Sequence, residues 1–169
     1  MINELLKEPV AIEHVTPRGF FRIQVTEERD GKQVVVSDTG EIENQITNLG
    51  FQNYMLGALG NIGGYKQVGY AALGTGGAPA AGDTTLAGEI ASGTQRSAVV
   101  ASVISYKTLR FQTTFLYTNS FLSVPTLLSN VGLFSSTDPA DNIFAGGAYT
   151  VPTVQINQNV VLIYDIRFA

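Results

Sequence analysis

His14 is the only histidine in the chain, and the chain has no cysteine. A histidine general base, a Ser-His-Asp triad or an imidazole-ligated zinc site would therefore depend on one side chain. His14 follows Glu13 in a proline-bounded segment, and no Gly-x-Ser-x-Gly sequence is present to expose a nucleophilic serine. The missing cysteine also excludes disulfides and thiolate metal ligands. We interpret His14 as a surface or interface side chain and predict that the protein is not an enzyme.

The glycine cluster Gly74-Thr75-Gly76-Gly77 invites comparison with phosphate-binding loops. Such a loop is followed by Gly-Lys-Ser/Thr and a helix, because the lysine and the helix amino terminus hold the phosphates. That sequence does not follow here, and Pro79 interrupts the segment that would form the helix. We interpret the cluster as a tight loop and expect no nucleotide or other cofactor.

Carboxylates gather at three places where a cation site is conceivable. Asp138-Pro139-Ala140-Asp141-Asn142 brings three oxygen-bearing side chains close together, but their spacing matches no calcium loop. An Asx-type turn is the simpler interpretation, because Asp and Asn side chains readily bond their own backbone. The acidic pairs Glu27-Glu28 and Glu41 with Glu43 are interpreted as solvated hairpin and loop residues. The sequence therefore predicts no metal site.

The composition favours a protein whose surface is partly covered by neighbours. Hydrophobic residues make up 44% of the chain and charged residues 14%, whereas about 25% of a typical domain is charged. Uncharged surface is usually tolerated where another subunit covers it. The net charge of −4 and the lack of a Lys/Arg cluster argue against direct nucleic-acid binding, which needs several phosphates neutralised together.

The length of 169 residues predicts a single domain. The acidic N-terminal segment does not resemble a secretory signal, and no stretch approaches the roughly 18 apolar residues of a membrane helix. We expect the protein to be made soluble in a cytoplasm and to have no membrane partner.

Alternating apolar residues predict a chain built mainly of β-strands. Phe21, Ile23 and Val25 fall on one face of a strand that begins at Phe20, and Asp30-Gly31 predicts a tight turn into the next strand. Later strands are predicted over 67–73, 97–107, 109–117, 125–134, 142–151 and 160–168. The last is apolar on both faces and is therefore expected at the centre of a sheet. Several short strands joined by turns indicate a β-sandwich or jelly roll.

One short helix is predicted, over residues 48–59. Its apolar face contains Leu49, Tyr54, Met55 and Leu59. Asn44 and Thr47 both precede it as candidate N-caps. Glycines at 57 and 60 make a longer helix unfavourable.

Residues 1–19 are predicted to form an extended N-terminal arm, and residues 20–169 the β-sandwich domain. Pro9 and Pro17 each restrict the preceding residue to extended conformations. The arm either lies on its own domain or reaches a neighbour, and the sequence leaves both alternatives open.

The segment 74–89, rich in Gly, Ala and Pro, is predicted to be a long loop that closes on a turn near Leu86.

Several motifs follow one another in an order that resembles a known class. Residues 73–79 and 83–89 read Leu-Gly-Thr-Gly-Gly-Ala-Pro and Asp-Thr-Thr-Leu-Ala-Gly-Glu. Five further motifs follow them: Arg96, a Phe- and Thr-rich strand over 109–119, Ser-Asn-Val-Gly-Leu-Phe over 129–134, Ile-Phe-Ala over 143–145, and the closing strand over 160–168. The Asp30-Gly31 hairpin and Asn-Gln-Ile-Thr-Asn-Leu-Gly over 44–50 precede them. This order resembles small virion structural proteins of tailed bacteriophages over about residues 20–168, with a departure at Asn130, where such proteins commonly have an acid.

The resemblance implies a β-sandwich subunit of the virion that acts as a capsid decoration (cement) protein. A neck, tail or fibre component is the alternative, and a carbohydrate-binding β-sandwich is a further one. The resemblance also implies symmetric self-assembly, in trimers especially, and contact with other virion proteins such as the major capsid protein. Enzyme and sugar-binding functions have no sequence feature of their own beyond composition.

The expected interface lies in the arm, at two tyrosines near glycine loops, and in the 74–89 loop. Its candidate residues are Val10, Ile12, His14, Tyr65, Tyr70, Gly74, Gly76, Pro79 and Leu86. Residues 74–82 are expected to approach a partner's backbone, and aromatic side chains to anchor the contact.

Overall fold

The computed structural model describes residues 16–90 and 95–168. The strands are β1 (Pro17–Arg29), β2 (Lys32–Asp38), β3 (Ile42–Ile46), β4 (Tyr70–Gly74), β5 (Ser97–Ala98), β6 (Val100–Ser105), β7 (Thr108–Phe115), β8 (Asn130–Phe134), β9 (Ala145–Ala148) and β10 (Gln158–Phe168). The helices are the π-helix η1 (Gly50–Leu56), the α-helix α1 (Gly57–Gly60) and the 3₁₀ turn η3 (Tyr117–Asn119). The predicted fold class, mainly β with a sandwich architecture and one short helical segment, is confirmed.

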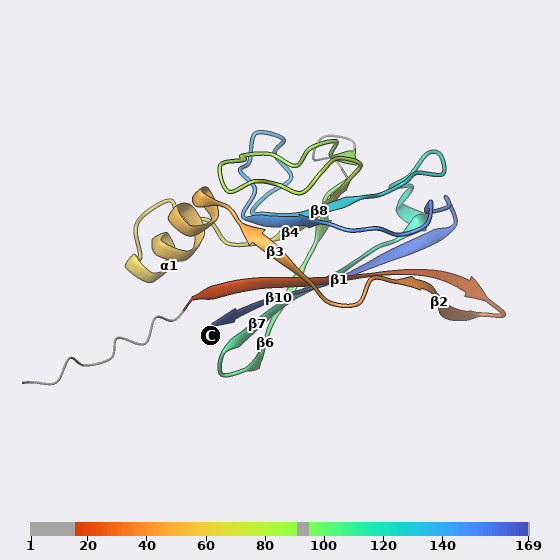
Figure 1. The fold of residues 1–169 in the computed structure, drawn as a ribbon, viewed down its shortest axis with the longest axis horizontal. Helices are drawn as coiled ribbons and strands as arrows, with labels where there is room; N and C mark the ends of the chain where they lie inside the picture. The colour runs from red at the N-terminus through yellow and green to blue at the C-terminus, as the bar shows by residue number, and fades with distance from the viewer. Residues whose placement is uncertain (1–15, 91–94, 169) are drawn as a thin grey trace, which may run out of the picture.

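The strands form two layers that are joined at both sides (Figure 1). Hydrogen bonds link them in the order β5-β4-β8-β9-β3-β1-β10-β7-β6, and β2 pairs separately with β1. At one side β3 passes between the layers, since Asn44 pairs with β1 and Gln45 pairs with β9. At the other side β5 pairs with β4, and after Val99 the chain continues as β6, which pairs with β7. The sheet is therefore almost closed into a barrel.

The hydrophobic core lies between the two layers. Phe21, Ile23 and Val25 of β1 are all buried, as their alternation predicts. They pack in one cluster with Leu162 and Tyr164 of β10, which lies between β1 and β7 in the centre of its layer, as predicted. The other layer contributes Ala71, Leu73, Val131 and Leu133 to this core.

The Asp30-Gly31 hairpin is confirmed. Both residues have positive φ, 53° for Asp30 and 72° for Gly31, as a turn between tightly paired antiparallel strands requires. β1 begins at Pro17 and not at Phe20, because its first residues pair with the end of β10, Pro17 opposite Phe168. Residues 1–15 of the predicted arm lie outside the described residues.

The chain becomes helical at Asn48, two residues before η1, and the hydroxyl of Thr47 accepts the N–H of Gly50 at 2.9 Å. Asn44 is the wrong choice of cap, because it lies within β3. The predicted apolar face is also wrong at the C-terminal end of the helical segment. Tyr54 is buried, but Leu59 is 84% exposed. The π-turns of η1 change the angular spacing on which that prediction depended.

Several strands are shorter than their sequence patterns predict. The segment 97–107 divides at Val99, where the chain leaves one layer for the other. Within the segments 125–134 and 142–151, continuous strands form only over β8 and β9, and Thr126 makes an isolated bridge to Val154. Tyr117, expected in a strand, begins the 3₁₀ turn η3.

Candidate assembly surface

The 138–142 segment uses its carboxylates within the fold. A side-chain oxygen of Asp138 accepts the N–H of Ala140 at 2.8 Å, which is the predicted Asx turn. Asp141 is buried, accepts the N–H of Ser135 at 2.7 Å and pairs with the ammonium of Lys66. Burial raises the pKa of Asp141, but the bonds from Lys66 and Ser135 outweigh it and the pKa is lowered. Within 16–90 and 95–168, no group of three or more His, Cys, Asp or Glu side chains is placed to hold a metal ion.

Arginine–carboxylate pairs cover the outer face of the layer that contains β1 and β10. The pairs are Arg18–Glu43, Arg22–Asp38, Arg110–Asp165 and Arg167–Glu41. Glu41 and Glu43 are exposed, as predicted, and both are paired. The hydrogen bond from Arg22 lowers the pKa of Asp38, against a smaller opposing effect of burial. Because each pair is neutral overall, this face presents little net charge.

The glycine-rich loop lies against its own chain, above β4 and β8 in Figure 1. A Cβ on Gly74 would lie 2.9 Å from the carbonyl oxygen of Ala87, and one on Gly76 would lie 2.5 Å from the Ala87 methyl carbon. Glycine is therefore needed at both positions by an internal contact. The side chains of Pro79 and Leu86 are buried within the chain. Contact of these four residues with a partner stays a prediction.

Arg96 fixes the far end of this loop. Its side chain is 1% exposed and makes a two-bond ion pair with Glu89, at 2.7 and 3.0 Å. Its guanidinium also donates to the carbonyl oxygens of Ser136 and Asp138 and lies 3.6 Å from the ring centroid of Phe134. Motifs that are separated in the sequence thus meet around one buried cation.

Asn130 fixes the near end of the loop. It is fully buried, and its amide NH₂ donates to the carbonyl oxygens of Gly77 at 2.9 Å and Ala87 at 2.8 Å. Two carbonyl acceptors require a donor here, which an amide supplies and an ionised carboxylate could not.

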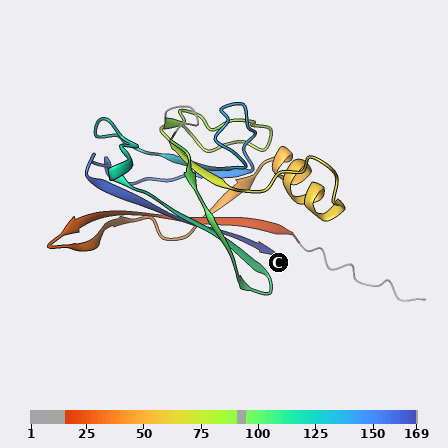
Figure 2. The same cartoon turned by 180° about the vertical axis from the view of Figure 1, so that it is seen from behind.

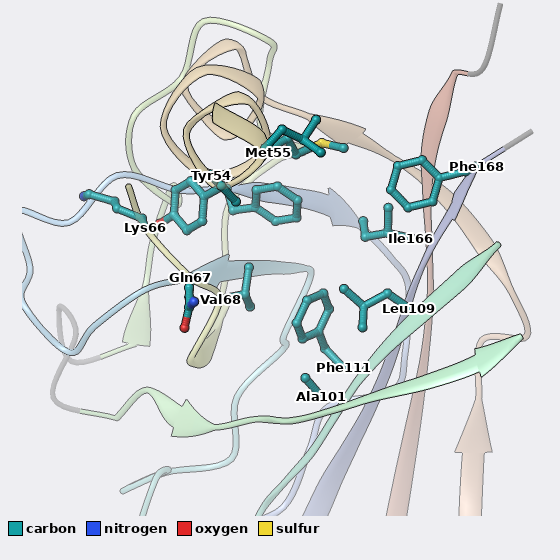
Figure 3. A pocket seen from close by; sticks show the side chains of 13 residues that line it. Tyr54, Met55, Lys66, Gln67, Val68, Ala101, Leu109, Phe111, Ile166 and Phe168 are labelled. Atoms are coloured by element: carbon teal, nitrogen blue, oxygen red, sulfur yellow. The ribbon is translucent and has the colours of Figure 1, made fainter. Parts of the chain in front are cut away.

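An apolar pocket of about 400 Å³ opens between the helical segment and the inner face of β7 and β10 (Figure 3). Leu109 and Phe111 of β7 and Ile166 and Phe168 of β10 form one wall. Met55 and neighbouring helical residues form the other wall, and Ala101 of β6 lies at its margin.

The Tyr54 hydroxyl and the Lys66 ammonium in the pocket wall are already engaged, and the Gln67 amide makes a 3.4 Å hydrogen bond to the Tyr65 hydroxyl. The Tyr54 hydroxyl donates to the carbonyl oxygen of Asn142 at 2.8 Å, and the Lys66 ammonium pairs with Asp141. Burial, with the nearby Asp141 charge, raises the pKa of Tyr54 to about 12, so this phenol stays neutral at physiological pH. Small-molecule sites usually combine an apolar wall with a few convergent polar groups. This pocket is better suited to the apolar side chains of a protein.

Beside the pocket lies the strand edge that we call the β6 edge, with the exposed side chains Val100, Val103, Ile104 and Tyr106. Val103 pairs with Leu109 and lies on the pocket face, whereas Val100 pairs with Gln112 and lies on the opposite face. Val100 is 72%, Val103 77% and Tyr106 94% exposed. β6 is the last strand of the order, and the β6–β7 hairpin extends away from the opposite layer (Figure 2). Every residue of β6 is exposed and none is charged. The sequence offered a signal for this surface, because residues 97–106 contain no charge.

Besides the four residues of the glycine-rich loop, the predicted interface includes two tyrosines and three arm residues. Tyr65 is exposed after the helical segment, and Tyr70 is half-buried at the start of β4. Val10, Ile12 and His14 lie outside the described residues. Neither tyrosine lies in the β6 edge, which the prediction missed.

The chain matches no protein-family model, no curated protein and no solved structure. None of the described helices is long and apolar enough to cross a membrane. The surfaces of the molecule are therefore the basis for proposing its function.

Proposed function

We propose that this protein is a structural subunit of a bacteriophage virion, most directly a capsid decoration (cement) protein that assembles with copies of itself and binds the shell. The observation that carries the proposal is the β6 edge, an uncharged apolar strand left open at the side of the sheet. A single folded chain with such an edge is prone to associate, unless a partner covers it.

The distribution of charge supports the same proposal. Most arginines of the β1–β10 layer are paired with carboxylates, so the fold leaves no cationic groove for a polyanion among the described residues. The remaining exposed surface includes Leu56 and Leu59 of the helical segment and Ile62 after it. Apolar patches of this kind favour extensive protein–protein contact.

The resemblance to small virion proteins adds to this support. Several of the motifs on which it depends meet in space, where Glu89, Arg96, Asn130 and Phe134 fasten one loop to one strand. A shared order of motifs is expected when the motifs form one internal cluster. That cluster is structural, so the specific partner is inferred from the resemblance and the apolar surface together.

The test is the copy number of the protein in purified virions of the phage that encodes it, measured by quantitative mass spectrometry against the major capsid protein. Electron cryo-microscopy of the same particles gives its position. Roughly one copy per capsid subunit, spread over the shell, is the expected result. A few copies per hundred at one vertex would instead favour the neck, tail or fibre alternative. Absence from particles would overturn the proposal, and binding to a glycan array would then favour a carbohydrate-binding module.

A further inference from the structure

We propose that residues 10–16 of one copy add as an antiparallel strand to the β6 edge of a second copy, with Val10 and Ile12 directed to the mouth of the apolar pocket. This inference rests on the self-assembly part of the proposed function and names the contact that produces it.

The β6 edge is ready to accept a strand. Within the described residues β6 pairs only with β7, so its outer backbone N–H and C=O groups face outward. Proteins usually protect such an edge with charges, proline or a covering segment. The sequence of β6, Val-Ala-Ser-Val-Ile-Ser, has none of these devices. Strand addition is the association mode that satisfies such an edge.

The N-terminal segment has the length and pattern of the missing strand. Residues 10–16 lie between Pro9 and Pro17, and their length matches the six residues of β6. Val10, Ile12 and His14 alternate with Ala11 and Glu13, so one face of an extended strand carries the two larger apolar side chains. Pro17, the first residue of β1, pairs with Phe168 of the pocket wall, so the segment joins the fold at the pocket end of its layer.

Strand direction selects a second copy as the acceptor. All pairs in the sheet are antiparallel, so β6 and β10 both run toward the end at which β1 begins. A segment that precedes β1 and folds back along β6 of its own copy would run parallel to β6. It would also have to cross the ends of β10, β7 and β6, about 19 Å at the usual strand spacing. Antiparallel addition, in keeping with the rest of the sheet, requires the β6 of a neighbour.

The side-chain register agrees with this arrangement. Ala101 pairs with Phe111 and Val103 pairs with Leu109, so both β6 side chains lie on the pocket face of the sheet. An added strand would place every second residue on that face, and Ala101 is small enough to leave room for a larger neighbour. Each copy would donate a strand at one site and accept one at another. Such a head-to-tail contact closes into a ring when its rotation permits, which agrees with the expected trimer.

The test uses engineered cysteines in the full-length protein, which has no cysteine of its own. Purified I12C and V103C proteins are mixed under mild oxidation and analysed on a non-reducing gel. The control mixes I12C with V35C, because Val35 is also an exposed valine on a strand but lies on β2, at the far side of β1 from β6. We expect at least about tenfold more mixed disulfide with V103C than with V35C, since docking raises the local thiol concentration.

Three results would overturn the inference. Equal crosslinking of V103C and V35C would remove the β6 edge as the acceptor. A monomeric intramolecular disulfide in the I12C/V103C double variant would place the segment on its own copy. Homodimers of V103C alone, without I12C crosslinks, would indicate β6 paired with β6. Because the assay needs no virion, its failure is distinguishable from absence of the protein in particles, which bears on the proposed function alone.

Discussion

The guanidinium of Arg96 lies 3.6 Å from the ring centroid of Phe134 and forms a two-bond ion pair with Glu89. The loop that leaves β4 is fastened through this contact to the start of β5 and to β8. Four of the five guanidinium N–H groups donate to the Glu89 carboxylate and to two carbonyl oxygens, and the cation also lies over an aromatic face.

Replacing Arg96 should strongly destabilise the fold. R96A removes the cation and leaves the Glu89 carboxylate unpaired, which is expected to cost about 3–5 kcal/mol of unfolding free energy. R96K should recover only part of it, because an ammonium lacks the planar fork that bonds two oxygens at once. Urea denaturation followed by circular dichroism measures both. R29A is the control, since Arg29 is exposed and should leave the urea midpoint nearly unchanged. A midpoint for R96A equal to that of R29A would contradict the assigned role.

Adjacent glycines in the loop should respond differently to alanine. A Cβ on Gly76 would collide with Ala87, whereas one on Gly77 meets nothing within 4 Å. We expect G76A to lower the unfolding free energy by about 1–3 kcal/mol through overpacking. G77A should be neutral or slightly stabilising, because alanine restricts the unfolded chain. Thermal denaturation of the two variants checks the pair, and equal melting temperatures would show that the loop does not hold this contact.

N130D tests why this position requires an amide. An ionised carboxylate would face the carbonyl oxygens of Gly77 and Ala87 and lose both hydrogen bonds. We expect a loss of about 2–4 kcal/mol at pH 7, partly recovered on acidification, because a protonated carboxyl can donate again. N119D, at an exposed position, is the matched control and should change little. Chemical denaturation at pH 7 and pH 5 distinguishes the two. If N130D is as stable as the unmodified protein, the donor role of Asn130 is disproved.

Asp165 should make the protein sensitive to acid. Burial raises its pKa, but hydrogen bonds from Arg110 and Arg167 outweigh that effect and lower it. Because the folded pKa lies below the unfolded value of about 3.9, its stabilisation is complete above that value and is lost as the pH falls through the folded pKa. D165N should therefore be less stable than the unmodified protein at pH 7, and the difference should shrink below about pH 4. Urea titrations at pH 7, 5 and 3 measure this, and a constant difference would show that Asp165 does not titrate in this way.

Sequence patterns were informative where neighbouring residues alone decide the conformation. Asp30-Gly31 favours positive φ at both turn positions, and the alternation of Phe21, Ile23 and Val25 follows directly from the pleat of a strand. The sequence indicated Thr47 and Asn44 as candidate N-caps, and in the structure it is the Thr47 hydroxyl that accepts the N–H of Gly50.

Pairing between residues far apart in the sequence decided how the strands and the loop are arranged. The sequence does not indicate that Arg96 would meet Phe134 and Glu89, that β3 would change layers after Asn44, or that the 97–107 segment would do the same at Val99. From its sequence alone, β6 has the composition of a buried apolar strand. Whether such a strand is central or at an edge depends on which partners the remaining strands take, and that is a property of the closed sheet. The exposure of Val100 and Val103, on which the proposals rest, is therefore a consequence of topology and not of residue type.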